Sequence, residues 1–203
     1  MGYLQNFILA FVFSFTGSIP PGTINLTILQ VGIERKLNIA LRFALAAALM
    51  EYPYAWLAVA FESYITSSPV IVDNFKLIGG IVMLVMGILN LLSARKPTAF
   101  LNKLQGSGFR RGIILGILNP MAIPYWIAMT AYMRLQGWIE FSDSYHLHAY
   151  LLGVSVGAFV ILMMIAQLAQ RMITAYRPGS FVKFIPGVVL VILGLYTFIQ
   201  YLF

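Results

Sequence analysis

The stretch Gly17-Ser-Ile-Pro20-Pro21-Gly22 interrupts the first apolar segment of the sequence, which runs from about residue 3 to residue 31. A proline inside a helix has no amide hydrogen, and its ring clashes with the carbonyl group four residues before it. The two prolines therefore free the carbonyls of Thr16 and Gly17, and the glycine after them relaxes the backbone further. We predict two half-helices that meet at a break, the second beginning near Thr23.

The composition around this stretch is that of a membrane protein. Hydrophobic residues make up 61% of the 203 positions, charged residues only 9%, and the mean hydropathy is +0.88. Soluble domains carry roughly 25% charged residues, so this chain could not cover a water-facing surface. It has no cysteine, which excludes disulfides, thiolate metal sites and cysteine nucleophiles. The first basic residue is Arg35, so we expect the N-terminal segment to stay in the mature protein as a helix and not to act as a signal peptide.

The apolar stretches predict an all-α fold of six transmembrane helices in a single domain over residues 1–203. Each stretch is close to the roughly 20 residues that a helix needs to cross the hydrocarbon core. The predicted spans are about Tyr3–Val31, Ile39–Ala60, Phe75–Ala94, Arg111–Met133, His148–Gln170 and Phe181–Phe203.

Basic residues orient these spans. Eleven of the 13 Lys and Arg residues fall in or beside the loops between spans 1 and 2, 3 and 4, and 5 and 6, and only Lys76 and Arg134 lie on the other side. Cytoplasmic loops retain Lys and Arg, so we expect these three loops in the cytoplasm and both termini outside, in a bacterial inner membrane. The net charge of +7 then reflects topology, and no nucleic-acid partner is expected.

Two pairs of spans resemble each other at similar spacing. Lys76–Gly87 in span 3 matches Lys183–Gly194 in span 6 at its Lys and closing Gly, and Gly17–Pro21 in span 1 matches Gly116–Pro120 in span 4. Chance recurrence of Gly in apolar helices is the alternative. A true repeat divides the chain into halves of about 1–97 and 106–203. Each half has three spans, so the halves cross the membrane in opposite senses, as in many secondary transporters.

The matched breaks in spans 1 and 4 predict a substrate site. Non-helical backbone at membrane depth is tolerated only where protein or a water-filled cavity surrounds it. Amide groups at the starts of the second half-helices suit a carboxylate, and carbonyls freed by the prolines, including that of Gly116, suit an ammonium group. The alternative is that the kinks serve only helix packing. The predicted substrate-binding residues are Thr16, Gly17, Pro20, Pro21, Gly22, Thr23, Asn25, Asn119, Pro120, Met121 and Tyr125.

Glu51 lies near the middle of span 2, with no basic residue in the middle of that span. A charge at mid-bilayer costs on the order of 2.5–3.5 kcal/mol by insertion measurements. Glu51 is therefore predicted to carry a proton or to anchor a substrate amine. The alternative is a neutral carboxyl group that bonds to neighbouring tyrosine hydroxyls.

Other signals carry less chemistry. Glycines at every fourth residue are interpreted as helix-packing positions. They form one series of Gly108, Gly112 and Gly116 and another of Gly153 and Gly157. His146 and His148, near Asp143, could ligate a metal, but a solvated loop is the favoured interpretation and no metal site is predicted. No nucleophile–base arrangement and no phosphate-binding loop appears, so neither catalysis nor a cofactor is expected.

These motifs, in this order, resemble the LysE-type amino-acid exporters, the lysine and homoserine/threonine exporter group, over nearly the whole chain. The family's first break resembles Ser18–Gly22, its Asn-Pro in the fourth span resembles Gly116–Pro120, and its mid-span acid, usually Asp, is similar to Glu51. The glycine-rich third span resembles Gly79–Gly87. Two departures stand out: Pro-Gly-Pro appears here as Pro-Pro-Gly, and the usual Lys after Asn-Pro is Met121, which removes a positive charge near the break.

The resemblance implies an inner-membrane exporter of amino acids or similar small amines that is driven by the proton gradient. Its partners would be the small-molecule substrate, protons and the lipid bilayer. A metal-ion transporter of the same architecture is the alternative, because relatives in the wider superfamily move metal ions. That alternative needs several oxygen ligands at the midplane, and the sequence offers only Glu51, Asn25 and Asn119. An enzyme or a scaffold is the third hypothesis. An enzyme needs a catalytic pair at one depth, which the sequence does not offer, and a scaffold needs neither two matched breaks nor a buried acid.

Overall fold

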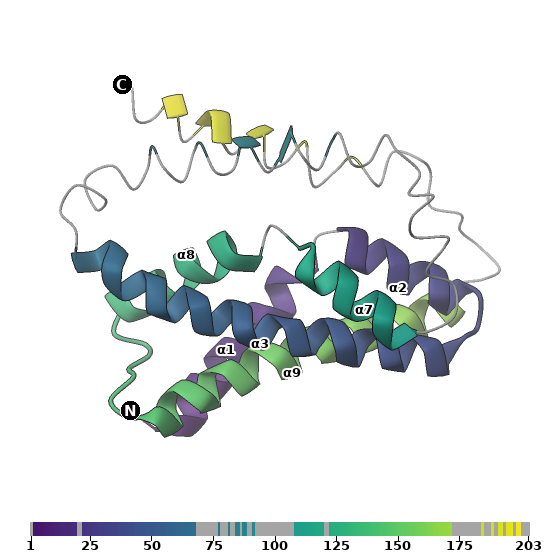
Figure 1. Ribbon diagram of the computed structural model, residues 1–203, viewed down its shortest axis with the longest axis horizontal. Coiled ribbons are helices and arrows are strands. Elements are labelled where there is room, and N and C mark those ends of the chain that lie inside the picture. Colours follow the sequence, from purple (N-terminus) through teal and green to yellow (C-terminus); the bar gives the residue numbers. More distant parts are fainter. Residues whose placement is uncertain are drawn as a thin grey trace.

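The computed structural model is mostly helical in the parts of the chain that it describes, which are residues 2–19, 22–67, 108–119 and 122–171 and isolated positions within 77–91 and 184–199. Figure 1 shows the helices of these parts, which are α1 (Tyr3–Gly17), α2 (Thr23–Ile33), α3 (Leu37–Ser67), α7 (Gly108–Ile117), α8 (Ala122–Leu135) and α9 (Ser144–Arg171). The predicted spans Phe75–Ala94 and Phe181–Phe203 lie outside the described residues, apart from those isolated positions.

Two of these helices are long and apolar enough to cross a membrane: α9, and α3 over Leu37–Glu62. The helices α7 and α8 together make a third candidate span, bent by 66° at the break between them. The helices α1 and α2 are shorter apolar helices. Large apolar side chains are exposed on the outside of the long helices, as at Leu41, Leu45 and Leu49 along one face of α3. That pattern suits a protein whose surroundings are hydrocarbon.

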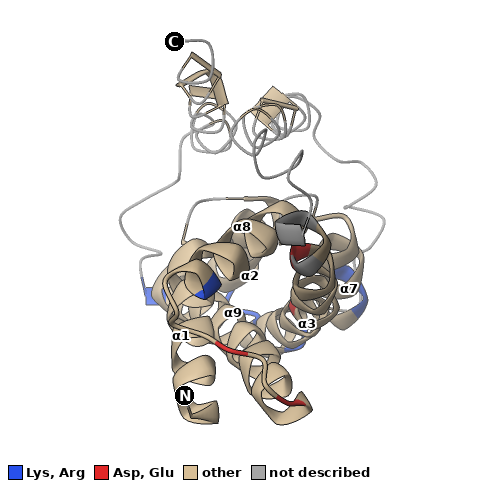
Figure 2. Ribbon diagram, turned by 90° about the vertical axis from the view of Figure 1, so that its left-hand side faces the viewer, with Lys and Arg blue, Asp and Glu red and all other residues tan. Residues whose placement is uncertain are grey.

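The two helix pairs that flank a break pack on the long helices in a crossed pattern. The helices α1 and α2 lie against α9, whereas α7 and α8 lie against α3, and α3 and α9 also contact each other. The start of α1, the end of α3 and the connection from α8 to α9 share one end of the bundle, which we call the N-terminal end (Figure 1, left). The other end carries the α2–α3 turn, the start of α7 and the end of α9. Figure 2 views the helices from the N-terminal end, with few charged positions among the uncharged ones.

Glycines let these helices approach closely. A Cβ atom at Gly108 or Gly112 would lie 2.3 or 2.4 Å from a backbone oxygen of α3, and one at Gly153 or Gly157 would lie 2.3 or 2.5 Å from a backbone oxygen of α1. No side chain fits at such distances. The glycines that the sequence marked as packing positions are therefore contact points between helices.

The core consists of two apolar clusters, one on each side of the breaks. The cluster at the N-terminal end contains Trp126, Met133 and Tyr150, and the cluster at the other end contains Ile28 and Phe43. The polar groups at the breaks lie between them, because Glu51 is flanked along α3 by Ala47 of one cluster and Ala55 of the other. The packing thus isolates a polar layer near the middle of the bundle.

Two tight turns end helices at opposite ends of the bundle. Gly137 has φ +66° after α8, and the amides of Gly137 and Trp138 bond back to the carbonyls of Arg134 and Met133. This is the left-handed helix ending that glycine favours. Arg35 adopts φ +57° in the α2–α3 turn although it carries a side chain, so this turn is strained.

Candidate functional site

The break in the first span lies between the end of α1 at Gly17 and the start of α2 at Thr23; Pro20 and Pro21 lie outside the described residues. The amide of Ile19 donates to the Thr16 carbonyl at 3.2 Å, which closes a tighter turn than the α-helix. The side-chain amide of Asn25 donates to the Ser18 carbonyl at 2.6 Å. Asn25 therefore bridges its own break.

The break in the fourth span has a similar construction. It separates the end of α7 at Ile117 from the start of α8 at Ala122, and its residues Pro120 and Met121 lie outside the described residues. The amide of Asn119 donates to the Gly116 carbonyl at 3.1 Å. The Tyr54 hydroxyl, from α3, donates to the Ile117 carbonyl at 2.6 Å.

These bonds correct one expectation. We expected the carbonyls of Thr16 and Gly116 to be freed, but each accepts an amide three residues further on. The reason is that the backbone tightens before the break and replaces the lost helical bond. Because a carbonyl oxygen has two lone pairs, each keeps capacity for one more donor. A bound ammonium group would share these oxygens with the backbone.

The two breaks contact each other through Tyr125, which the sequence singled out beside the second break. Its hydroxyl donates to the Phe13 carbonyl in the last turns of α1, at 2.7 Å. The same ring lies against Gly17, where an added Cβ atom would be 2.0 Å from the tyrosine oxygen. Only glycine at position 17 leaves room for this contact between the first and fourth spans.

Glu51 lies in the polar layer between the two apolar clusters, and its side chain is partly accessible. The indole N–H of Trp126, a residue that is 2% exposed, donates to a Glu51 carboxylate oxygen at 2.8 Å. The side chain of Asn119 bonds to the same carboxylate, and Tyr54 and Tyr125 lie within electrostatic range of it. Glu51 thus joins α3 to both sides of the break in the fourth span.

The donors that hold Glu51 are neutral. Among the described residues the ion pairs are Glu34–Lys36, Glu62–Arg134 and Asp143–His146, and none of them includes Glu51. A carboxylate offers about four lone-pair positions, and two N–H donors leave some of them open. The arrangement can therefore accept a proton or the ammonium group of a ligand.

Three predicted site residues beside the first break lie apart from these contacts. Gly22 precedes α2 in an extended conformation, and an added Cβ atom there would meet nothing within 4 Å. Thr23 is exposed at the first position of α2, and Thr16 is exposed at the end of α1, its hydroxyl donating to the Val12 carbonyl at 2.7 Å. The structure thus brings Gly17, Tyr125, Asn119 and Glu51 together.

Sequence reasoning missed two contributors to this layer. Tyr54 lies three residues after Glu51, so helical spacing alone could have placed both on one side of α3. Trp126 is adjacent to Tyr125 in the sequence, and no periodic signal there marks its side chain as part of the site. Its role follows only from the packing of α8 against α3.

The two histidines have separate partners. His146 Nδ1 lies 2.8 Å from an Asp143 oxygen, and that oxygen also accepts the His146 amide. These two bonds, the backbone one first, lower the pKa of Asp143 below its ordinary value. His148 Nδ1 instead bonds to the Tyr52 hydroxyl. Within the described part of the chain, no group of three or more His, Cys, Asp or Glu could hold a metal ion.

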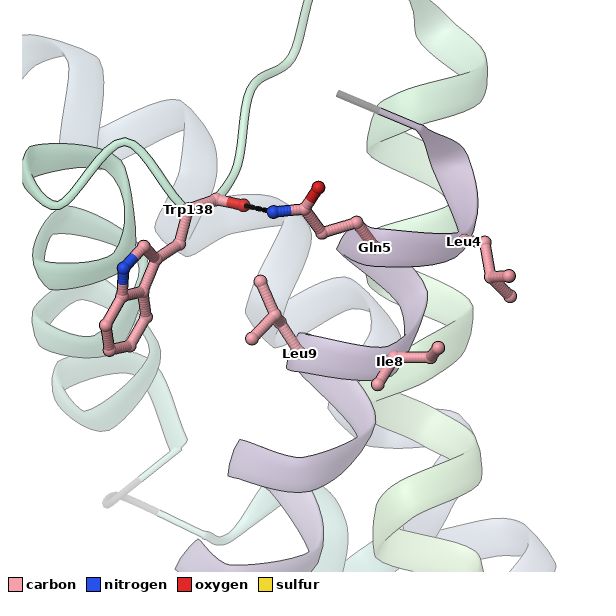
Figure 3. Close-up of a pocket in the computed structure, with 5 residues that line it drawn as sticks. All are labelled: Leu4, Gln5, Ile8, Leu9 and Trp138. Atoms are coloured by element: carbon pink, nitrogen blue, oxygen red, sulfur yellow. Dashed lines mark hydrogen bonds between the residues drawn. The ribbon is translucent and has the colours of Figure 1, made fainter.

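A shallow apolar groove at the N-terminal end lies away from this layer. Figure 3 shows its lining by Leu4, Gln5, Ile8 and Leu9 of α1 and by Trp138, with the Gln5 amide bonded to the Trp138 carbonyl at 3.1 Å. Its lining contains no charged group, so the groove does not extend the site around Glu51.

Apolar helices around a polar layer, with breaks between α1 and α2 and between α7 and α8, are the features of a membrane protein. Comparison with known families agrees, because the family model of the LysE type translocators matches residues 15–201, which is most of the chain. The chain therefore belongs to the LysE type translocator family. The comparisons with curated proteins and with solved structures found no match.

Proposed function

We propose that this protein is a secondary transporter that exports amino acids or similar small amines across the bacterial inner membrane, in exchange for protons. The observation that carries the proposal is Glu51, a carboxylate in the middle of an apolar helix that two neutral donors hold at the break between α7 and α8. Intramembrane acids of this kind mark substrate and proton pathways. Membership of a translocator family supports the same conclusion.

The packing supports six spans arranged as two inverted halves. Each broken span lies against the second span of the other half: α1 and α2 against α9, and α7 and α8 against α3. When the halves are inverted repeats, a pseudo-two-fold axis in the membrane plane relates them, so that the broken span of each half packs on a helix of the other half. The glycine contacts of α7 with α3 and of α9 with α1 also join a helix of one half to a helix of the other.

The two ends of an amino acid find complementary groups in the site. Its ammonium group would bond to Glu51, with the carbonyl of Gly116 nearby, since Gly116 packs against Met50, the residue before Glu51. Its carboxylate would lie at the amide ends of α2 and α8, where the helix dipoles are positive. Because Met121 brings no charge to the second break, we propose that the amine dominates recognition and that simple amines also bind.

Competition between a proton and an ammonium group for Glu51 couples the export of the amine to the import of protons. A proton and an ammonium group both neutralise the carboxylate, so one excludes the other. On the cytoplasmic side the proton leaves and the amine binds; on the outer side a proton displaces the amine. Each cycle then exports one amine and imports one proton through the same acid.

The charges support the proposed orientation. Among the described residues, the basic side chains at the α2–α3 turn, the start of α7 and the end of α9 share the end opposite the N-terminus, and Arg134 alone lies at the N-terminal end. By the positive-inside rule, the N-terminus then faces outward. At the cytoplasmic end Lys36 pairs with Glu34 at 2.8 Å and lowers the pKa of that carboxyl.

Counterflow in proteoliposomes tests the proposal. Vesicles loaded with one unlabelled amino acid or amine from a panel are diluted into the same labelled compound. The wild-type protein should accumulate label for at least one compound, and Glu51→Gln should not. Glu34→Gln is the matched control, because it makes the same chemical change at an exposed pair, and it should transport like wild type. Exchange of metal ions alone, or full exchange by Glu51→Gln, would refute the proposal.

A further inference from the structure

A second carboxylate of α3 is buried at the N-terminal end of the bundle. Glu62 is only 2% exposed, and one of its oxygens lies 2.7 Å from a guanidinium nitrogen of Arg134, the basic residue in the last turn of α8. Glu62 follows Glu51 by eleven residues, which is about three helical turns and about 16 Å along α3. The two acids therefore lie on nearly the same face, and both bond to α8.

The connection between α8 and α9 contacts other helices at the same end of the bundle. The Arg134 guanidinium lies over the Phe141 ring, 5.7 Å from its centroid. The Asn6 side chain of α1 donates to the Glu140 carbonyl at 2.8 Å. The pair thus belongs to a set of contacts that joins α1, α3 and α8 at this end. At the other end, Glu34 pairs with a residue only two positions along the chain.

The geometry of α8 couples this pair to the substrate site. The helix begins at the break, where α7 and α8 meet at 66°, and it ends at the ion pair. A rotation of α8 about the break would displace its far end most, and so would part Glu62 from Arg134. The same rotation would shift Trp126 and Tyr125, which hold Glu51 and contact α1.

We propose that the Glu62–Arg134 pair is the outer latch of the transporter, the contact that keeps the route from Glu51 to the outside closed. This inference rests on the proposed function. A carboxylate left without its partner in a closed, buried site is strongly unfavourable, so the pair and the closed state stabilise each other. When the end opens, water solvates both charges, and Arg134, whose side chain is already 42% exposed, turns outward.

Cysteine accessibility tests the latch without any knowledge of the substrate. Since the chain has no cysteine, a single Ala55→Cys reporter, at a fully buried position one turn after Glu51 on α3, reacts alone with a membrane-impermeant methanethiosulfonate reagent. The reagent is applied from the face that carries the N-terminus, and a second series places the reporter at Tyr54→Cys. Glu62→Gln and Arg134→Gln should each raise the labelling rate at least tenfold. The charge exchange E62R/R134E should return it to within about threefold of the parent.

Glu34→Gln makes the same change at the exposed pair with Lys36 at the opposite end of the bundle and should leave outer labelling unchanged. If a neutral variant does not fold, Arg134→Lys takes its place, with an expected increase of about threefold. Labelling within twofold of the parent at both reporters would overturn the latch. A panel without a transported compound, alongside faster labelling in the latch variants, would refute the proposed substrates and leave the latch standing.

Discussion

Gly17→Ala tests whether the two breaks touch as described. The added methyl group would lie 2.0 Å from the Tyr125 oxygen and 2.4 Å from the carbon that bears it. The ring must therefore move, and the hydroxyl would lose its bond to the Phe13 carbonyl. Overpacking costs about 1–3 kcal/mol, and a lost hydrogen bond adds about 1 kcal/mol. We expect a total loss of about 2–4 kcal/mol in the free energy of unfolding.

This loss is measurable as a fall in the thermal midpoint of the purified protein in detergent. For a chain of this size each kcal/mol corresponds to about 2–4 °C, so the midpoint should fall by about 4–16 °C. Gly2→Ala is the matched control, because an added Cβ atom there meets nothing within 4 Å, and it should change the midpoint by less than about 2 °C.

A double variant identifies the cause. If the clash with Tyr125 is responsible, Gly17→Ala should cost little once the ring is absent, so that G17A/Y125A is about as stable as Tyr125→Ala alone. Additive losses in the double variant, or a Gly17→Ala protein as stable as wild type, would show that the first and fourth spans do not meet at this point.

Two further predictions concern single hydrogen bonds. Trp126→Phe removes the indole donor of Glu51. Because a hydrogen bond to a charged group is worth about 1.5–3 kcal/mol, this variant should lower the counterflow rate about tenfold or more. The control Trp138→Phe should not lower it, and equal rates for both variants would contradict the role of Trp126. At the start of α9 the folded-state pKa of Asp143 is lowered from 3.8, chiefly by the His146 amide. A carboxyl group whose pKa is lowered on folding stabilises the protein above its ordinary pKa, and this stability is lost as the pH falls through the folded-state pKa. The thermal midpoint of the wild type should therefore fall more on acidification through these pH values than that of Asp143→Asn does. Parallel falls in both proteins would show that Asp143 does not stabilise the fold in this way.

Much of the helical framework could be predicted because it depends on local chemistry. The start of α2 at Thr23 follows from the prolines and glycine before it. The packing glycines follow from their four-residue spacing, since any helix brings such positions onto one face. Helix ends were less predictable: α3 runs to Ser67, seven residues past the predicted end of its span. The extension places Glu62 inside the helix and within reach of Arg134.

The detail of the site required the packing of helices that are distant in sequence. Glu51 could be recognised because a lone acid in an apolar span is costly. Its partner Trp126 lies 75 residues away, and nothing in a single sequence relates the two. The carbonyl of Thr16 was expected to be freed because its helical donor is missing, yet a three-residue turn supplies another. Short-range rearrangements of this kind follow from backbone geometry that residue types alone do not determine.

The central claim is that one carboxylate, Glu51, serves both the exported amine and the proton. Its most direct test is amine-driven proton flux: proteoliposomes with a trapped pH indicator receive a compound that counterflow has shown to be transported. Wild-type protein should move protons against the direction of the amine, and Glu51→Gln, although folded, should move none. Proton movement by Glu51→Gln equal to that of wild type would contradict the account.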